Sequence, residues 1–269
     1  MAGANRFGLN RHIPEKIKKK VRRRCKFGCV VCGSAIVTYE HIDPPFSDAR
    51  EHNPTNITLL CGHHQLESSK GLLSKDSIQE FNTNPRGSRR GYVDHIFDLN
   101  GKVPSLVLGS TNIDLKPGQV FSINGLPIFK IDHPEQNSRR WRLSAIFYGE
   151  KNQIICYIEK NELRLLAHNY DIVQISRRFC ISNINGDRVF KLETSPPDKL
   201  IIKFMKLTLD GDEVLVDGNT VMFENAAKTT GVKFEECEFS GFASFTINEN
   251  GLRMSPRSEC PWPSDLKVP

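Results

Sequence analysis

Two short pairs of metal-binding residue types lie near the start of the sequence. The first pair is Cys29-x-x-Cys32 and the second is Cys61-x-x-His64. Cysteine and histidine at this spacing are usual ligands of a tetrahedral structural zinc ion. Each pair could hold one side of the ion, and closing the chain between the pairs would order a segment too small to build a core alone. The sequence therefore predicts a Cys₃His zinc site.

The chain has eight cysteines, and the others fit other roles. Cys25 precedes Cys29 by four residues and is a rival ligand, although its place at the end of a basic segment favours packing in the core. The N-terminal residues have no apolar stretch typical of a signal peptide, so we expect a cytosolic protein with free thiols. The remaining cysteines are expected to be small buried residues: Cys156, Cys180, Cys237 and Cys260.

Further residues that could bind an ion or take part in catalysis lie between and beside the two pairs. The stretch "LLCGHHQ" contains His63 and Gln65 next to the expected zinc ligands, and it could hold an ion or a catalytic base. Glu40 and His41 lie between the pairs, and Asn56 precedes the second pair. A lone Glu-His pair on a strand is most often only a polar surface, so its interpretation depends on the motifs around it.

Together these motifs resemble those of the HNH endonucleases. The family pattern is a CxxC, a strand with an acidic residue and a histidine, a loop, and then N-x-x-x-L-C-x-x-C/H. In this chain the pattern reads "CVVC", "YEHIDP" and "NITLLCGHH", in the same order and spacing. The resemblance covers about residues 11–74 and implies a small zinc-bound domain of the ββα-metal fold.

The resemblance implies a role for each matching residue. His41 would be the general base that activates water for attack on a phosphodiester. Glu40 would bind a catalytic Mg²⁺ or Mn²⁺ ion, which would stabilise the charge that develops at the phosphate. Asn56 would hold the loop, orienting His41 or helping to bind the ion. The products would carry a 5′-phosphate and a 3′-hydroxyl.

One position departs from the family pattern. The family commonly has a histidine after the last zinc ligand, and this chain has Gln65 there. Gln65 could serve as a weak ligand, His63 could reach the ion from an earlier position, or Glu40 and Asn56 could hold the ion alone. A domain that binds nucleic acid without cutting it is the fourth alternative.

The positive charge of the chain lies entirely in its first hundred residues. These hold 16 Lys and Arg against 10 Asp and Glu, whereas the rest holds 21 of each. Such an excess indicates a polyanionic partner, here DNA, or only a solvated basic face. The segment "PEKIKKKVRRRC" is expected to form a basic helix that begins at Pro14. The expected phosphate contacts are Lys18, Lys19, Arg22, Arg23 and Lys70.

The remaining pattern predicts an α+β protein with two domains. Residues 1–85 would form the nuclease domain, with strands at "AIVTYEHI" and "ITLL" and a helical pattern from Gly62 to about Phe81, broken near Gly71. Residues 86–105 would be a linker. Residues 106–269 would form a mostly antiparallel β domain, like a sandwich or barrel, with a β-solenoid as the alternative. Asn-Gly and Asp-Gly pairs between alternating segments predict hairpins there.

These patterns lead to competing functions. The first is a metal-dependent DNA endonuclease, with restriction or anti-phage defence as a setting by analogy alone. The alternatives are a non-catalytic zinc-knuckle DNA-binding protein and an RNA-cleaving nuclease. No membrane segment is expected, because no apolar run reaches about 20 residues. The sequence leaves open a homodimer and a regulatory ligand or partner for the β-rich half, although Arg139, Arg140 and Trp141 could contact nucleic acid there.

Overall fold

Two compact units divide the chain. The computed structural model describes residues 3–99, 102–149, 153–166, 170–183, 185–229, 231–248, 250–257 and 260–263. Unit 1 consists of Met1–His95, Leu165–Gln174 and Asn183–Gly186, and unit 2 consists of Ile96–Arg164, Ile175–Ser182 and Asp187–Pro269. No helix among these described residues is long and apolar enough to cross a membrane.

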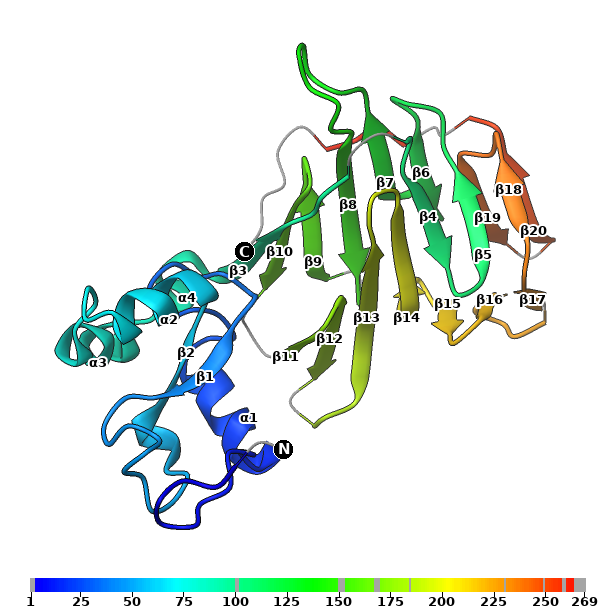
Figure 1. Ribbon diagram of the computed structural model, residues 1–269. Coiled ribbons are helices and arrows are strands. Elements are labelled where there is room, and N and C mark those ends of the chain that lie inside the picture. Colours follow the sequence, from blue (N-terminus) through cyan, green and yellow to red (C-terminus); the bar gives the residue numbers. More distant parts are fainter. Residues whose placement is uncertain are drawn as a thin grey trace. The chain divides into compact units, whose positions relative to one another are not determined.

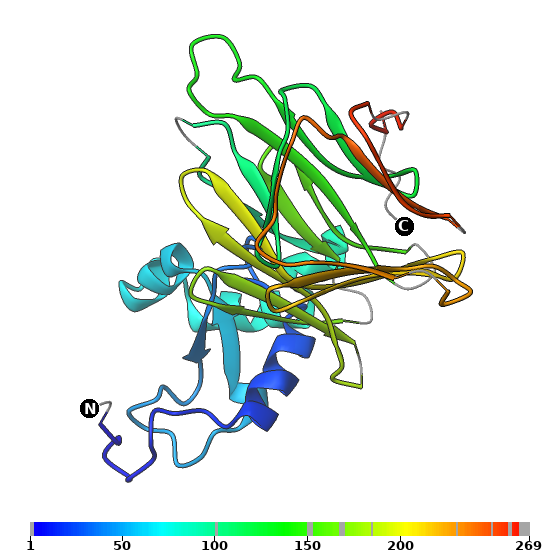
Figure 2. The ribbon, with the colours of Figure 1, turned by 90° about the vertical axis from the view of Figure 1, so that its right-hand side faces the viewer.

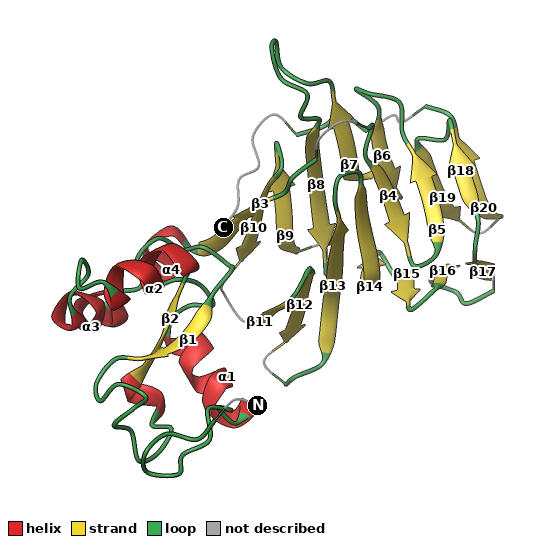
Figure 3. Ribbon diagram, viewed as in Figure 1, coloured by secondary structure: helices red, strands yellow, loops and turns green. Residues whose placement is uncertain are grey.

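Unit 1 contains the helices of the described chain and a short hairpin (Figures 1 and 3). The helices are α1 (Glu15–Arg24), η1 (Pro54–Asn56, a 3-10 turn), α2 (Gly62–Ser69), α3 (Lys75–Thr83) and α4 (Arg86–Arg90). The hairpin strands are β1 (Thr38–His41) and β2 (Ile57–Leu60), and they pair antiparallel with Thr38 opposite Leu60 and His41 opposite Ile57. Both strands fall within the segments predicted from their β-branched and aromatic residues.

The core of unit 1 explains the orientation of this hairpin. All four residues of β2 are buried, whereas β1 is half-buried to exposed and carries the polar side chains. Helix α1 contributes Val21 to the core, and Figure 2 shows this helix alongside the two strands. The buried cluster consists of Ile13, Val21, Cys25, Cys29, Val30, Ile42, Ile57, Leu59, Leu60 and Ile78. Because β2 is the buried strand, Glu40 and His41 lie on β1, the more exposed strand of the hairpin.

The predicted helical pattern after residue 61 forms two helices. Helix α2 ends at Ser69, and α3 begins at Lys75 with the Ser74 hydroxyl accepting a hydrogen bond from the backbone N–H of Ser77. Gly71 lies between them with φ of +73°, in the left-handed region that glycine adopts without strain. The break predicted near this glycine is confirmed.

Strands dominate the rest of the chain (Figure 3). One sheet has the order β20-β19-β6-β7-β8-β9-β10-β3, and another has the order β11-β12-β13-β14-β15-β16-β17 with β4, β5 and β18 paired beside it. The bounds of the first sheet's strands are β3 (Tyr92–Ile96), β6 (Val120–Ile123), β7 (Leu126–Asp132), β8 (Arg142–Tyr148), β9 (Ile154–Glu159), β10 (Glu162–Leu166), β19 (Ser244–Asn248) and β20 (Gly251–Ser255). Those of the second are β4 (Ser105–Leu108), β5 (Thr111–Asp114), β11 (Tyr170–Ile175), β12 (Arg178–Asn183), β13 (Arg188–Ser195), β14 (Lys199–Leu209), β15 (Asp212–Asp217), β16 (Thr220–Glu224), β17 (Gly231–Phe234) and β18 (Glu238–Ser240).

The α+β prediction is confirmed, and the large sheets are open. Most strand pairs are antiparallel, while β4 with β14, β5 with β18 and β6 with β19 are parallel. Asn124-Gly125 and Asp210-Gly211 form tight hairpin turns with positive φ at both residues, as these residue pairs predict.

The segment 86–105, expected to be a linker, contains regular structure. It holds α4 and β3, and the contacts of the chain place the boundary between His95 and Ile96. The backbone N–H of Ala35 donates to the carbonyl of Asp94 at 2.7 Å, so β3 is tied to the segment after the first cysteine pair. Its Gly and Arg residues indicated a flexible connection, but Val93 is fully buried and anchors the strand.

Candidate functional site

The four predicted zinc ligands lie together in unit 1. One ligand atom from each of Cys29, Cys32, Cys61 and His64 lies within 4.8 Å of all the others. The Sγ atoms of Cys32 and Cys61 are 3.8 Å apart, and Nδ1 of His64 lies 3.0 Å from Sγ of Cys61 and 3.5 Å from Sγ of Cys29. This cluster, called here the Cys₃His cluster, could hold a metal ion.

Backbone contacts shape the cysteine turn. The N–H of Gly33 donates to the carbonyl of Cys29 at 2.8 Å, and Gly33 adopts a φ of +87° that favours glycine. Gly28 lies so close to Val93 that an added Cβ would approach its side chain to 2.6 Å. The N–H of Val30 donates to the carbonyl of Leu59, which ties the first pair of ligands to the strand that precedes the second pair.

The chemistry of the cluster suits a cation. Hydrogen bonds with the Cys32 thiol and with backbone N–H groups together lower the pKa of the Cys29 thiol to about 5, although burial opposes them. Thiolates are the form in which cysteines bind metal. The other ring nitrogen of His64, Nε2, lies 3.8 Å from the carboxylate of Glu67, so this acidic group can orient the ring while Nδ1 faces the thiols.

The rival ligand Cys25 is turned away from this cluster. Its Sγ lies 3.8 Å from the hydroxyl of Thr58 and 3.7 Å from Oδ1 of Asn82, and its side chain is fully buried. Burial raises the pKa of its thiol, which favours the neutral form. Cys25 is therefore placed as a core residue.

Glu40 and Gln65 meet at the surface between β1 and α2. The Gln65 amide donates from Nε2 to Oε2 of Glu40 at 2.9 Å, and its Oε1 accepts from the hydroxyl of Thr38 at 3.2 Å. Burial raises the pKa of Glu40, while the hydrogen bond from Gln65 and the charge of Arg11 lower it. The structure thus brings together the acidic residue and the glutamine that sequence analysis placed at one site.

His63 lies elsewhere. It is exposed, and its Nε2 lies 3.3 Å from a carboxylate oxygen of Glu67, one turn along the same helix. His63, His64 and Glu67 form a second group that could bind a cation, but this group shares His64 with the Cys₃His cluster. Gln65 and His63 were the two candidates to replace the family's final histidine as a ligand of the catalytic ion. Gln65 contacts Glu40, whereas His63 contacts Glu67.

His41 has a second histidine as its neighbour. Its Nε2 lies 3.2 Å from Nδ1 of His52, and Nε2 of His52 lies 2.8 Å from the backbone carbonyl of Asn10. Burial lowers the pKa of His41, and the charges of His52 and Arg11 lower it further. Sequence analysis did not include His52, because its polar loop lies eleven residues further on and no local motif links the two.

Asn56 holds the end of the loop that follows β1. Its backbone carbonyl accepts from the N–H of Ile42 at 2.8 Å, directly after His41 in the chain. Its side-chain Oδ1 accepts from the hydroxyl of Thr55 at 3.0 Å. Asn56 therefore fixes the backbone beside His41 through its main chain.

The residues expected to contact phosphate differ in accessibility. Arg22 is 5% exposed, and its guanidinium is engaged by Asp171, Glu15 and the hydroxyl of Tyr39. It therefore binds β11 within unit 1 and has no free face for a phosphate. Lys18 lies 5.7 Å from the centre of the Tyr39 ring. Arg23 and Lys70 are exposed, and Lys19 is half-buried.

The N-terminal arm, residues 3–11, carries basic side chains and borders His41. Sequence analysis did not predict this. The guanidinium of Arg11 lies 4.9 Å from the centre of the Phe46 ring, and that ring lies 5.4 Å from the ring of His41. A cavity of about 670 Å³ opens here, lined by Gly3, Ala4, Asn5, Arg6, Arg11, Phe46 and Ser47. The arginines that precede the first motif were the signal available in the sequence. The sequence did not show which loop these arginines would contact.

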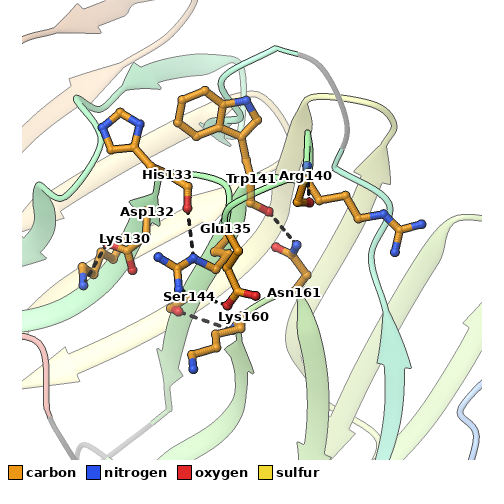
Figure 4. Close-up of polar contacts among 11 residues, drawn as sticks. Lys130, Asp132, His133, Glu135, Arg140, Trp141, Ser144, Lys160 and Asn161 are labelled. Carbon is orange, nitrogen blue, oxygen red and sulfur yellow. Dashed lines mark hydrogen bonds and ion pairs between the residues drawn. The ribbon is translucent and has the colours of Figure 1, made fainter.

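A second basic and aromatic group lies on the β7–β8 hairpin in unit 2. The Trp141 ring lies 5.6 Å from that of His133, and its carbonyl accepts from Nδ2 of Asn161 at 2.6 Å. Arg139 and Arg140 are exposed, and the Arg140 side chain is directed away from the other residues drawn (Figure 4). Trp141 is thus in contact with His133 of its own hairpin and with Asn161 of the β9–β10 turn, while the two arginines are exposed.

Comparison with known proteins adds no relative. No protein-family model, curated protein or solved structure matches the chain. Conclusions about the site therefore depend on its residues and their geometry.

Proposed function

We propose that the chain is a metal-dependent endonuclease of the HNH type, which hydrolyses phosphodiester bonds in DNA and leaves 5′-phosphate and 3′-hydroxyl ends. The observation that carries the proposal is the contact between Glu40 and Gln65, made where a strand with an adjacent histidine meets the helix that supplies His64. An acidic residue, a neutral oxygen ligand and a nearby imidazole are a donor set suited to phosphodiester hydrolysis.

The Cys₃His cluster would hold a structural zinc ion. Ligand atoms about 2.0–2.3 Å from a tetrahedral zinc lie roughly 3.3–3.8 Å from one another. Three of the separations are 3.0, 3.5 and 3.8 Å, and all four ligand atoms lie within 4.8 Å of one another, so the four side chains converge closely enough to hold one ion. A set of four protein ligands leaves no open position for water, which is typical of a structural ion.

Glu40 and Gln65 would hold the catalytic Mg²⁺ or Mn²⁺ ion. Neighbouring ligand atoms on an octahedral Mg²⁺ lie about 3 Å apart, and the two head groups are 2.9 Å apart. Rotating the Gln65 amide by half a turn would present its oxygen to the ion, and the Thr38 hydroxyl could then accept from its nitrogen. The ion would supply charge stabilisation at the phosphate and at the leaving oxygen.

The chain's own residues would position the substrate and move the proton. His41 would take a proton from the attacking water, since it directly follows Glu40 on β1 and its ring is half-buried. Asn56 would keep the backbone at His41 fixed through its bond from Ile42. Arg11 would bind a phosphate next to the one that is cut, because its charge acts on both Glu40 and His41.

The ion-binding role of Gln65 leads to a prediction for its isosteric acid. Gln65→Glu should lower the Mn²⁺ concentration needed for half-maximal binding by about tenfold, because added ligand charge strengthens binding of a divalent ion. The measurement is a calorimetric Mn²⁺ titration of the zinc-loaded chain. Gln79→Glu, which adds the same charge at an exposed position on α3, should leave the titration unchanged. Weaker Mn²⁺ binding in Gln65→Glu would show that Gln65 serves only as a donor to Glu40.

The phosphate-binding role of Arg11 leads to a second prediction. Arg11→Gln should weaken DNA binding about equally for all sequences and reduce the slope of log affinity against log salt by about one, as for the loss of one phosphate contact. Binding of labelled duplex at several salt concentrations measures both effects. Lys199→Gln removes an exposed charge from β14 and serves as the control. An unchanged salt slope in Arg11→Gln would remove Arg11 from the interface.

Cleavage of matched oligonucleotides tests the proposed function and its alternatives. DNA and RNA of one sequence would be incubated with the zinc-loaded chain and Mg²⁺, and the ends of the products would be identified by labelling. The proposal expects cut DNA with 5′-phosphate ends. Cutting confined to RNA would favour the RNA nuclease, and bound but intact DNA would favour the zinc-knuckle binding protein, which the glutamine at position 65 keeps as the second candidate.

A further inference from the structure

We propose that His52 is a positioning residue that directs the His41 ring, so that the proton of neutral His41 is on Nε2 and the free lone pair is on Nδ1. The inference rests on the proposed function in one respect only, the assignment of His41 as the base. Its structural basis is the chain of contacts from His41 through His52 to the carbonyl of Asn10.

The direction of these hydrogen bonds follows from the last acceptor. A backbone carbonyl can only accept, so Nε2 of His52 must carry the proton donated to Asn10 at 2.8 Å. A neutral imidazole has one N–H, so Nδ1 of His52 is then an acceptor. Nε2 of His41, 3.2 Å away, must donate to it. The remaining nitrogen of His41, Nδ1, is left with a lone pair that can take a proton from water.

The surroundings hold the two rings in this relation. The Phe46 ring is 5.4 Å from that of His41 and 6.5 Å from that of His52, to which it lies nearly parallel at 11°. The side chain of Asn5 donates to the carbonyls of Phe46 and Ala49 at 2.6 Å each, which ties this loop to the N-terminal arm. The arm thereby provides both the carbonyl that orients His52 and the anchor for the aromatic ring.

Two substitutions separate hydrogen bonding from packing. His52→Asn keeps an oxygen near the place of Nδ1, which can still accept from His41, whereas His52→Leu fills the space without an acceptor. Zinc content of both variants, compared with the native chain, shows whether unit 1 remains folded. If His52 positions the base, kcat should fall about tenfold in His52→Leu with KM little changed, and His52→Asn should restore most of the loss.

Nitrogen NMR of the full chain at about pH 8, where unperturbed histidines are neutral, tests the tautomer without any cleavage. The expected native spectrum shows a slowly exchanging proton on Nε2 of His41 that is coupled to Nδ1 of His52. His52→Leu should lose the slow exchange, and His52→Asn should keep it. A proton on Nδ1 of native His41, or unchanged exchange in His52→Leu, would overturn the inference. A native chain that cuts nothing would contradict the proposed function, while the spectrum would still decide the tautomer.

Discussion

Replacing His41 by alanine should lower the rate of DNA cleavage by about 10²- to 10⁴-fold, the usual contribution of a general base. The loss should appear in kcat, because in the proposed mechanism His41 would act on the attacking water and the phosphate contacts would come from other residues. The fold should persist, since His41 is half-buried on β1 and lies outside the buried cluster of unit 1. Single-turnover cleavage of a labelled duplex at saturating protein measures the effect.

The control for this variant is His133→Ala, which removes an exposed histidine from unit 2. Its cleavage rate should equal that of the native chain. DNA binding by His41→Ala should stay close to native, which would show that the substrate still reaches the site. Equal cleavage by His41→Ala and the native chain would remove His41 from the chemistry.

Cys61→Ser should abolish stoichiometric zinc binding and unfold much of unit 1. The ion would join the turn at Cys29 and Cys32 to the start of α2, and in small zinc domains the bound ion contributes roughly 10 kcal/mol or more to folding. Zinc content by elemental analysis and amide hydrogen exchange across β1, β2 and α2 measure the two effects. The strands of unit 2 should keep their protection, because they have their own buried residues.

Cys180→Ser is the matched control for this loss. Cys180 is half-buried on β12, outside the Cys₃His cluster, so its variant should keep one zinc per chain and native exchange in unit 1. Full zinc content in Cys61→Ser, or native protection of β2 after the ion is removed, would show that the cluster is not a structural zinc site.

The sequence predicted those parts of the site that depend on local spacing. A CxxC turn and a Cys-x-x-His at a helix start bring their side chains together over a few residues, and the hydrophobic pattern indicated both hairpin strands. That the CxxC pair and the Cys-x-x-His pair lie together was then inferred from the four ligands that one tetrahedral zinc ion requires. The contact between Glu40 and Gln65 was expected only from the family resemblance, because it joins a strand to a helix 25 residues later.

Contacts between distant segments could not be predicted in this way. Arg22 resembled its basic neighbours in sequence, but Asp171 lies 149 residues further along and forms two hydrogen bonds of 3.0 Å with its guanidinium. His52 was not among the predicted site residues, since its contact with His41 depends on how the N-terminal arm folds over the loop after β1. The segment 86–105 was expected to be a linker from its Pro, Gly and Arg residues, and β3 was missed because it pairs with a strand far away in the chain.

Nicking of supercoiled plasmid tests the central claim most directly. The zinc-loaded native chain and His41→Ala, purified identically, would be incubated with plasmid in the presence and absence of added Mg²⁺ or Mn²⁺. Nicked and linear DNA should form only with the native chain and the added ion. Intact plasmid in every reaction, with DNA binding retained by both proteins, would contradict the assignment of a nuclease site to Glu40, His41 and Gln65.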